Sequence, residues 1–260
     1  MARPEQAHPS KLDLQIYHSP VYSSNMRKST DDLSTEFLRI CRKKDYRGAA
    51  VFQDTIRNLI PGKAVRRKFR TVCGLDISFD KKSDHVYAAG AVYRYPELDK
   101  IEERSLEAIV RFPYVPGLLA FREGPAVMKL LRTIKSPVDV LLFDGQGLAH
   151  PRGTGIASMM GLLLKMPSVG CAKSKLVGEY GEPDAPKGAL SDLVYKGKLV
   201  GKVLRTRENV KPVFVSVGHK VDLDKAVEIV LTCTTRYRIP EPIRAAHILA
   251  NELRTSRRDS

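Results

Sequence analysis

The chain of 260 residues is long enough to bury a full hydrophobic core, so one large domain with an extension is expected. Its hydrophobic content of 43% and charged content of 28% are ordinary for a soluble globular protein, but its net charge of +15 favours polyanionic partners such as nucleic acid. The four cysteines form no CxxC pair, and no apolar run approaches about 20 residues. No signal peptide is expected, because the first residues lack its apolar core. These features favour a reduced, cytoplasmic protein without a membrane span.

The first 70 residues differ in composition from the rest of the chain. Residues 1–30 are polar and lack a clear period, which predicts a disordered leader. Residues 31–70 predict a basic helical N-terminal extension with helices over 33–41 and 47–59. Residues 1–70 carry 15 Lys or Arg against 7 Asp or Glu, a net +8, and end in the cluster Arg66, Arg67, Lys68 and Arg70. This cluster suggests nonspecific contact with a nucleic-acid backbone, although a solvated basic face is the alternative.

Residues 71–253 alternate between short strands and helices. Strands are expected over 72–79, 86–95, 101–111, 138–143, 168–172, 193–195, 199–204 and 213–217. Helices are expected over 118–134, with a break at Pro125, and over 156–164, 223–234 and 243–253, followed by a basic tail at 254–260. This order predicts an α/β fold with a mixed sheet flanked by helices, which resembles the ribonuclease-H-like nucleases.

Three carboxylates lie on separate elements of this predicted fold. Asp76 interrupts an apolar strand, Asp144 ends another, and Glu123 lies on the intervening helix. A buried charge is costly without a partner, and carboxylates that converge form a site for a hard cation such as Mg²⁺. His219, which follows a later strand, is a candidate to orient water or balance charge.

Two loops between these elements have unusual compositions. The stretch 145–155 is rich in glycine and contains His150 and Arg152, so its backbone can approach a ligand closely. The stretch 113–116 has two prolines around Tyr114, which would present the ring rigidly for insertion beside an unstacked base. Alone, the second loop could equally be a turn with an exposed tyrosine.

Five spaced motifs carry a resemblance to a known family. They are GLDISF, RFPYVPGLLAFRE, LLFDGQGLAHPRGTGIAS, PSVGCAKSKL and VSVGHKV, spread over about residues 71–253. In this order they resemble endonuclease V, a nuclease directed at deoxyinosine or inosine. Gln146 and Met159 depart from the DGHG and ASH forms common in the family.

The resemblance implies a role for each matching residue. Asp76, Glu123 and Asp144 would hold the metal, with His219 and Lys173 as further catalytic residues. Pro113, Tyr114, Val115 and Pro116 would form a strand-separating wedge, and Arg152 and Lys173 would contact phosphate. The pocket for the flipped base would be formed by Gly117, Leu119, Gly145, Gly147, His150, Gly155, Ile156 and Gly161. No role follows for the other histidines, including His247, which are expected to be surface or core groups.

The implied activity is cleavage of the second phosphodiester bond 3′ to the lesion, leaving a 3′-hydroxyl and a 5′-phosphate, in repair of deaminated adenine. Mg²⁺ is the expected cofactor, with Mn²⁺ able to substitute, and a monomer acting on deoxyinosine DNA or inosine RNA is expected. Alternatives are an inosine-specific endoribonuclease, another ribonuclease-H-like nuclease such as a junction resolvase, and a non-catalytic nucleic-acid-binding relative. The motifs PYVPG and DGxGxxHPR argue against another ribonuclease-H-like nuclease, and the retained acids argue against a non-catalytic relative. The sequence does not decide between DNA and RNA.

Overall fold

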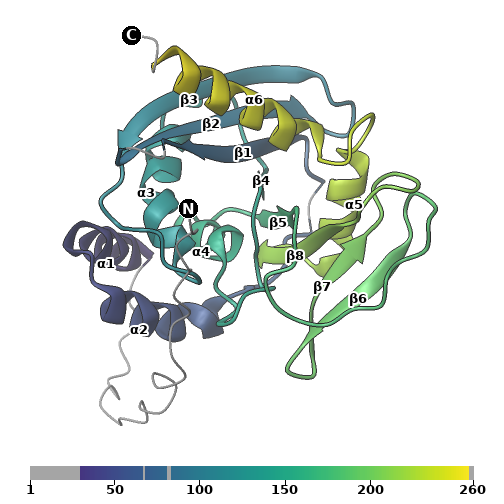
Figure 1. The fold of residues 1–260 in the computed structure, drawn as a ribbon, viewed down its shortest axis with the longest axis horizontal. Coiled ribbons are helices and arrows are strands. Elements are labelled where there is room, and N and C mark those ends of the chain that lie inside the picture. The colour runs from purple at the N-terminus through teal and green to yellow at the C-terminus, as the bar shows by residue number, and fades with distance from the viewer. Residues whose placement is uncertain (1–29, 67, 81–82, 258–260) are drawn as a thin grey trace, which may run out of the picture.

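The computed structural model describes residues 30–66, 68–80 and 83–257. Its eight strands form one mixed sheet in the order β3-β2-β1-β4-β5-β8-β7-β6 (Figure 1). The strands are β1 (Thr71–Phe79), β2 (His85–Arg94), β3 (Lys100–Ile109), β4 (Val140–Phe143), β5 (Ser168–Ala172), β6 (Leu190–Tyr195), β7 (Lys198–Leu204) and β8 (Val213–His219). The β1–β4 and β4–β5 pairs are parallel, and the other five pairs are antiparallel.

Helices cover both faces of the sheet (Figure 1). The helices are α1 (Thr30–Lys43), α2 (Tyr46–Ile56), α3 (Leu119–Leu131), α4 (Ile156–Leu163), α5 (Leu223–Thr232) and α6 (Glu241–Ser256), with a 3₁₀ turn at Arg57–Leu59. Alternate residues of β1 and β4 supply two cores: Leu75 and Leu141 face α1–α4, whereas Val72 and Leu142 face α5 and α6. The predicted α/β, ribonuclease-H-like class of mixed sheet flanked by helices is confirmed.

The helices α1 and α2 are part of this core rather than a separate extension. The rings of Phe37 in α1 and Phe52 in α2 have centroids 5.3 and 6.0 Å from that of Phe121 in α3. All three residues are buried in the core on this face of the sheet. Within the predicted extension 31–70, helical structure ends at Leu59, and these helices pack into the domain assigned to residues 71–253.

Two other boundaries differ from the sequence-based expectation. Helix α3 continues through Pro125 because burial of residues such as Phe121 and Gly124 on this helix outweighs the single backbone hydrogen bond that proline removes. Helix α6 extends to Ser256, and Arg254 donates to Asn251 and to the Phe79 carbonyl, so the predicted tail is partly helical. The predicted leader, except Thr30 in α1, and the last three residues lie outside the described ranges.

The strand directions define two edges of the sheet. The strands β1, β4 and β5 all end at one edge, which we call the carboxyl edge. Because β8 runs antiparallel to β5, His219 pairs with Ser168 at the opposite edge. The segment before β1 also follows that opposite edge, where Val65 N donates to Lys220 O at 3.0 Å. Exposed Arg66, Lys68 and Arg70 are in this segment, which leads to the start of β1, away from the carboxyl edge.

Candidate active site

Two of the predicted acids meet at the carboxyl edge. Leu75 in β1 pairs with Phe143 in parallel β4, and this register places Asp76 beside Asp144. The Asp144 backbone N–H donates to Leu75 O at 3.3 Å. The Asp76 and Asp144 side chains are only 12% and 13% exposed. Parallel pairing thus brings together carboxylates from distant parts of the chain.

Glu123 in α3 completes the set of acids. It is 9% exposed, and burial followed by the charges of Asp76 and Asp144 raises its pKa to about 8. Burial and the Asp144 charge also raise the pKa of Asp76, opposed mainly by its hydrogen bond to His247. The three carboxylates therefore interact electrostatically in one poorly solvated region.

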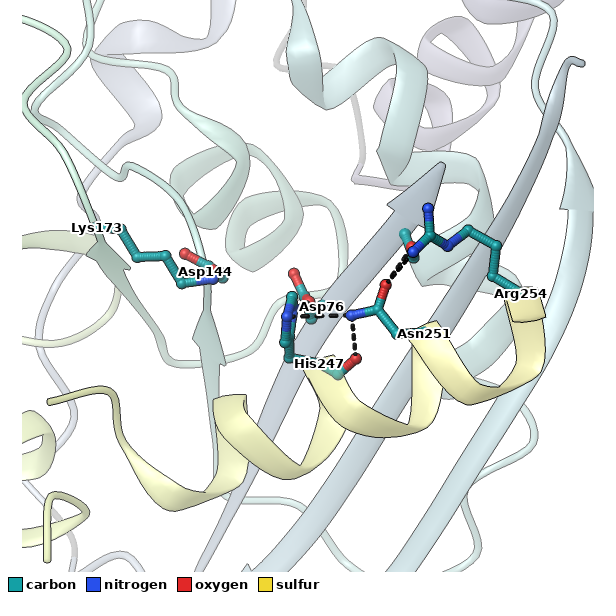
Figure 2. Close-up of polar contacts among 7 residues, drawn as sticks. Asp76, Asp144, Lys173, His247, Asn251 and Arg254 are labelled. Atoms are coloured by element: carbon teal, nitrogen blue, oxygen red, sulfur yellow. Dashed lines mark hydrogen bonds and ion pairs between the residues drawn. The ribbon is translucent and has the colours of Figure 1, made fainter. Parts of the chain in front are cut away.

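Two basic side chains approach these acids (Figure 2). Lys173, directly after β5, forms an ion pair with Asp144 through Nζ and Oδ2. His247 on α6 lies with Nδ1 2.6 Å from Asp76 Oδ2. The prediction that Lys173 belongs to the site agrees with this geometry, whereas the role of His247 was missed.

His219 does not join the acids. It lies at the opposite edge of the sheet, paired with Ser168, and its ring lies against Gly62. Burial is the largest cause that lowers its pKa to about 4. The expectation that His219 acts at the acid site is therefore wrong in this structure, because the antiparallel direction of β8 carries it away.

His247 occupies the place that His219 was expected to fill. Asn251, one helical turn later, donates from Nδ2 to His247 Nε2 at 3.1 Å, and its Oδ1 accepts from Ser78 Oγ at 2.8 Å (Figure 2). Helix α6 comes this near because Gly74 in β1 has no side chain: a Cβ there would lie 2.1 Å from the Pro242 carbonyl carbon. The sequence signal was a polar i, i+4 pair beside the apolar residues of a predicted helix.

Arg238 fixes the backbone at Lys173. Its Nη2 donates to Lys173 O at 2.6 Å and to Pro212 O at 2.7 Å. Burial lowers the pKa of this guanidinium, while the Cys171 and Asp144 charges act in the opposite direction. Arg238 thereby holds the chain after β5 next to the acids, a role the motif analysis did not assign.

The three acids suit a hard divalent cation chemically. Their oxygens are the ligand type that Mg²⁺ prefers, and their mutual repulsion is the effect that a bound cation would relieve. Across the described part of the chain, however, no three His, Cys, Asp or Glu side chains are grouped closely enough to hold an ion. Asp144 faces Lys173, so metal binding there would require Lys173 to move aside, whereas His247 contacts Asp76 through its Oδ2.

The predicted wedge is an exposed loop between β3 and α3. Tyr114 is 69% exposed, whereas Val115 is partly buried against the core. The Leu118 backbone N–H donates to Val115 O at 2.9 Å, and Gly117 has a φ of 79°, which favours glycine. We refer to residues 113–118, whose backbone presents the Tyr114 ring to solvent, as the wedge loop.

The Gly-rich loop 145–155 lies against the wedge loop. His150 Nε2 donates to Gly117 O at 3.0 Å, and burial lowers the pKa of His150 to about 4. Arg152, on the same loop, is 38% exposed, with Nε 4.0 Å from Asp54 Oδ1 of α2. His150 thus braces the two loops, and Arg152 has an accessible guanidinium.

The glycines of the predicted pocket have different surroundings. A Cβ at Gly147 would lie 2.1 Å from Val217 O, and one at Gly155 would lie 2.2 Å from Gln146 O, so the loop fits only without side chains there. Gly145 lies next to Ile156 at the start of α4, and Leu119 begins α3 after the wedge loop. Gly161 instead packs against Ser168 and His219. A glycine is required there by the close contact between α4 and the sheet, and not by a base pocket.

Comparison with known proteins identifies the family of this fold. The family model described as Endonuclease V matches residues 55–248, so the chain belongs to the endonuclease V family. A relative named Endonuclease V from Methanothrix thermoacetophila is 52% identical over 183 residues, covering 70% of this chain and 81% of the relative.

Solved structures of the family have the same fold. Endonuclease V from Streptomyces avermitilis is 40% identical with a TM-score of 0.77, covering 81% of this chain and 93% of that one. Endonuclease V from Ciona intestinalis is 28% identical with a TM-score of 0.70, covering 80% and 96% of the two chains. That protein was solved in complex with a 24mer DNA containing an inosine followed by a ribo-adenosine.

Proposed function

We propose that this protein is a metal-dependent endonuclease that cleaves the second phosphodiester bond 3′ to deoxyinosine, in repair of deaminated adenine. The products would carry a 3′-hydroxyl and a 5′-phosphate. The observation that carries the proposal is the placement of Asp76 beside Asp144 at the ends of two parallel neighbouring strands, with Lys173 against Asp144 and His247 against Asp76.

The acids would hold Mg²⁺, or Mn²⁺ in its place. When bound, the ion would lower the pKa of an attacking water and stabilise charge on the phosphate. Lys173, on leaving Asp144, has an ammonium free to contact the phosphate near the cut. Asn251 donates to Nε2 of His247, which keeps the ring proton on Nδ1, facing Asp76. His247 would therefore fix the orientation of this carboxylate.

The two loops would separate the strands and receive the base. Extruding a base from a duplex costs about a few kcal/mol, and less when the base is mispaired. Tyr114 is exposed where a wedge is needed, and the Gly-rich loop that would receive the base lies against the wedge loop. Hypoxanthine resembles guanine without its 2-amino group, so a tight backbone-lined pocket would reject guanine by steric conflict.

Inosine RNA is the second candidate substrate, since the Ciona intestinalis complex contains a ribonucleotide directly after its inosine. We expect the protein to act as a monomer in the cytoplasm. Among the described residues, no helix combines the length and apolar character needed to cross a bilayer. Cleavage of matched DNA and RNA oligomers, each with one inosine, tests the proposal and separates the two substrates. Cutting without dependence on inosine would contradict it.

A further inference from the structure

One side chain of α2 bonds to both loops. Gln53 is fully buried, and its Nε2 donates to Gly117 O in the wedge loop at 2.9 Å. The same nitrogen lies 3.4 Å from Thr154 O in the Gly-rich loop. Since both neighbouring atoms are carbonyl oxygens, the amide nitrogen must face them. Gln53 therefore bridges two segments that are 64 and 101 residues away in sequence.

Adjacent contacts strengthen this bridge. Gly117 O also accepts from His150 Nε2, so one carbonyl receives donors from α2 and from the Gly-rich loop. Asp54, the next residue of α2, faces Arg152 at 4.0 Å. Helix α2 is itself fixed by the burial of Phe52 in the core. A rigid element thus contacts both loops through neighbouring side chains.

Stability alone does not explain a glutamine at this position. Within the described ranges, Gln53 Oε1 and Thr154 Oγ1 are both buried without a hydrogen-bond partner. An unsatisfied buried polar atom destabilises a fold, whereas an apolar side chain of similar size avoids that cost. The amide is thus suited to hold the two loops rather than to stabilise the core.

We propose that Gln53 is a positioning residue that couples the wedge loop to the Gly-rich loop, fixing Tyr114 relative to the segment that receives the extruded base. This inference rests on the proposed function. Duplex substrates require strand separation and base capture together, whereas single strands require only capture. The position of Glu123 does not depend on this bridge, because its helix α3 packs closely against Phe37 and Met160 at Gly124. Losing the bridge should therefore impair duplex cleavage most.

The first test is Gln53→Met, which keeps side-chain size and removes both polar atoms. We expect an unchanged or higher Tm, with kcat/KM on duplex inosine falling by about 10-fold, because a misplaced loop impairs orientation. On single-stranded inosine the fall should be no more than about 3-fold, since only capture is affected. The control is Ser34→Ala, which removes a bond from α1 to Leu163 O far from the loops and should leave the ratio of the two rates unchanged. Equal losses on both substrates would overturn the proposal.

A double-mutant cycle tests whether Gln53 acts through the wedge. If it does, Gln53→Met combined with Tyr114→Ala should cleave duplex inosine no more slowly than Tyr114→Ala alone. Losses that multiply would mean that the two residues act independently, and the proposed coupling would be wrong.

Hydrogen exchange provides a readout that does not depend on activity. In Gln53→Met, amides of residues 113–118 and 147–155 should exchange faster than in the wild type, while Ser34→Ala leaves them unchanged. A wild-type protein that cleaves no inosine substrate would defeat the proposed function but leave this exchange result interpretable. Unaltered exchange in both loops would overturn the positioning role of Gln53.

Discussion

His247 Nδ1 lies 2.6 Å from Asp76 Oδ2, although 171 residues separate them in sequence. The contact exists because α6 returns across β1 at the close approach allowed by Gly74 (Figure 2). The histidine next to the acids is therefore His247 on α6, and not His219 at the end of β8.

Replacing each histidine in turn tests this assignment. His247→Ala should lower kcat on an inosine substrate by about 10²-fold, the scale typical of a lost acid–base or orienting group. His219→Ala should affect mainly stability, because that ring packs against Gly62 at the other edge. The measurement is single-turnover cleavage, with thermal unfolding of both variants as the control. A larger kinetic loss in His219→Ala would contradict the assignment.

Asp144→Asn should abolish cleavage while leaving inosine-dependent binding largely intact. The change removes a charge from the acid set but leaves both loops in place, and catalysis through a metal requires that charge. Asp192→Asn is the matched control, because Asp192 pairs with Lys202 on the exposed β6–β7 hairpin. Near-normal turnover of Asp144→Asn in saturating Mg²⁺ would refute its role as a ligand.

Tyr114→Ala should reduce cleavage of duplex inosine more than cleavage of single-stranded inosine. The ring is 69% exposed at the tip of a loop fixed by prolines, and a wedge matters most where bases must be unstacked. The measurement is the rate of cleavage of each substrate by Tyr114→Ala, divided by the rate of the wild type on the same substrate. Equal losses would assign Tyr114 to the fold or to direct contact with the flipped base.

The contribution of His150 to stability should fall as the solution becomes more acidic than about pH 6.5, whereas Glu123, whose pKa is raised to about 8, contributes a change of the opposite sign. Burial lowers the pKa of His150 from 6.5 to about 4, so the unfolded chain binds more protons than the folded one in this window. The contribution is present above pH 6.5 and is lost as the pH falls through about 4, amounting to about 3 kcal/mol over the window. The pKa of His219 is also lowered to about 4, so His219 contributes a further loss of stability over the same pH window.

His150→Asn should therefore flatten the dependence of unfolding free energy on pH between 6.5 and 4. Denaturant unfolding at a series of pH values measures this slope, which isolates the titration from any constant cost of the substitution. A slope identical to the wild type would show that His150 does not titrate as its burial indicates.

The basic segment before β1 should not contribute to substrate binding. Neutralising Arg66, Lys68 and Arg70 to glutamine should leave the salt dependence of binding unchanged, because the segment runs along the edge opposite the acids. Each lost phosphate contact would otherwise lower the log–log slope by about 0.9 on duplex DNA. Binding titrations of the wild type and the neutralised variant at several salt concentrations measure this slope. A lower slope for the variant would contradict the prediction.

Local patterns in the sequence predicted most of the elements and the acid set. The apolar run of β4 is typical of a buried parallel strand, and a charge inside β1 marked Asp76 as unusual. What local patterns did not predict were contacts set by the return path of the chain. His247 reaches Asp76 only because α6 crosses back over β1, and Gln53 reaches the loops only because α2 packs into the core.

The position of His219 was misjudged for the same reason. His219 was placed at the carboxyl edge on the assumption that β8 runs in the same direction as β1, β4 and β5. Its pairing with β5 and β7 is antiparallel, so β8 runs the other way. Strand direction depends on long-range topology, which residue spacing alone does not encode.

The central claim is that the acids and the loops form one inosine-directed, metal-dependent cutting site. The most direct measurement uses end-labelled duplexes identical except for inosine or adenine at one position, incubated with Mg²⁺ or with EDTA. We predict one cut, at the second phosphodiester bond 3′ to inosine, only with Mg²⁺ and leaving a 5′-phosphate. Cleavage of the adenine duplex at the same rate, or undiminished cleavage in EDTA, would contradict the account.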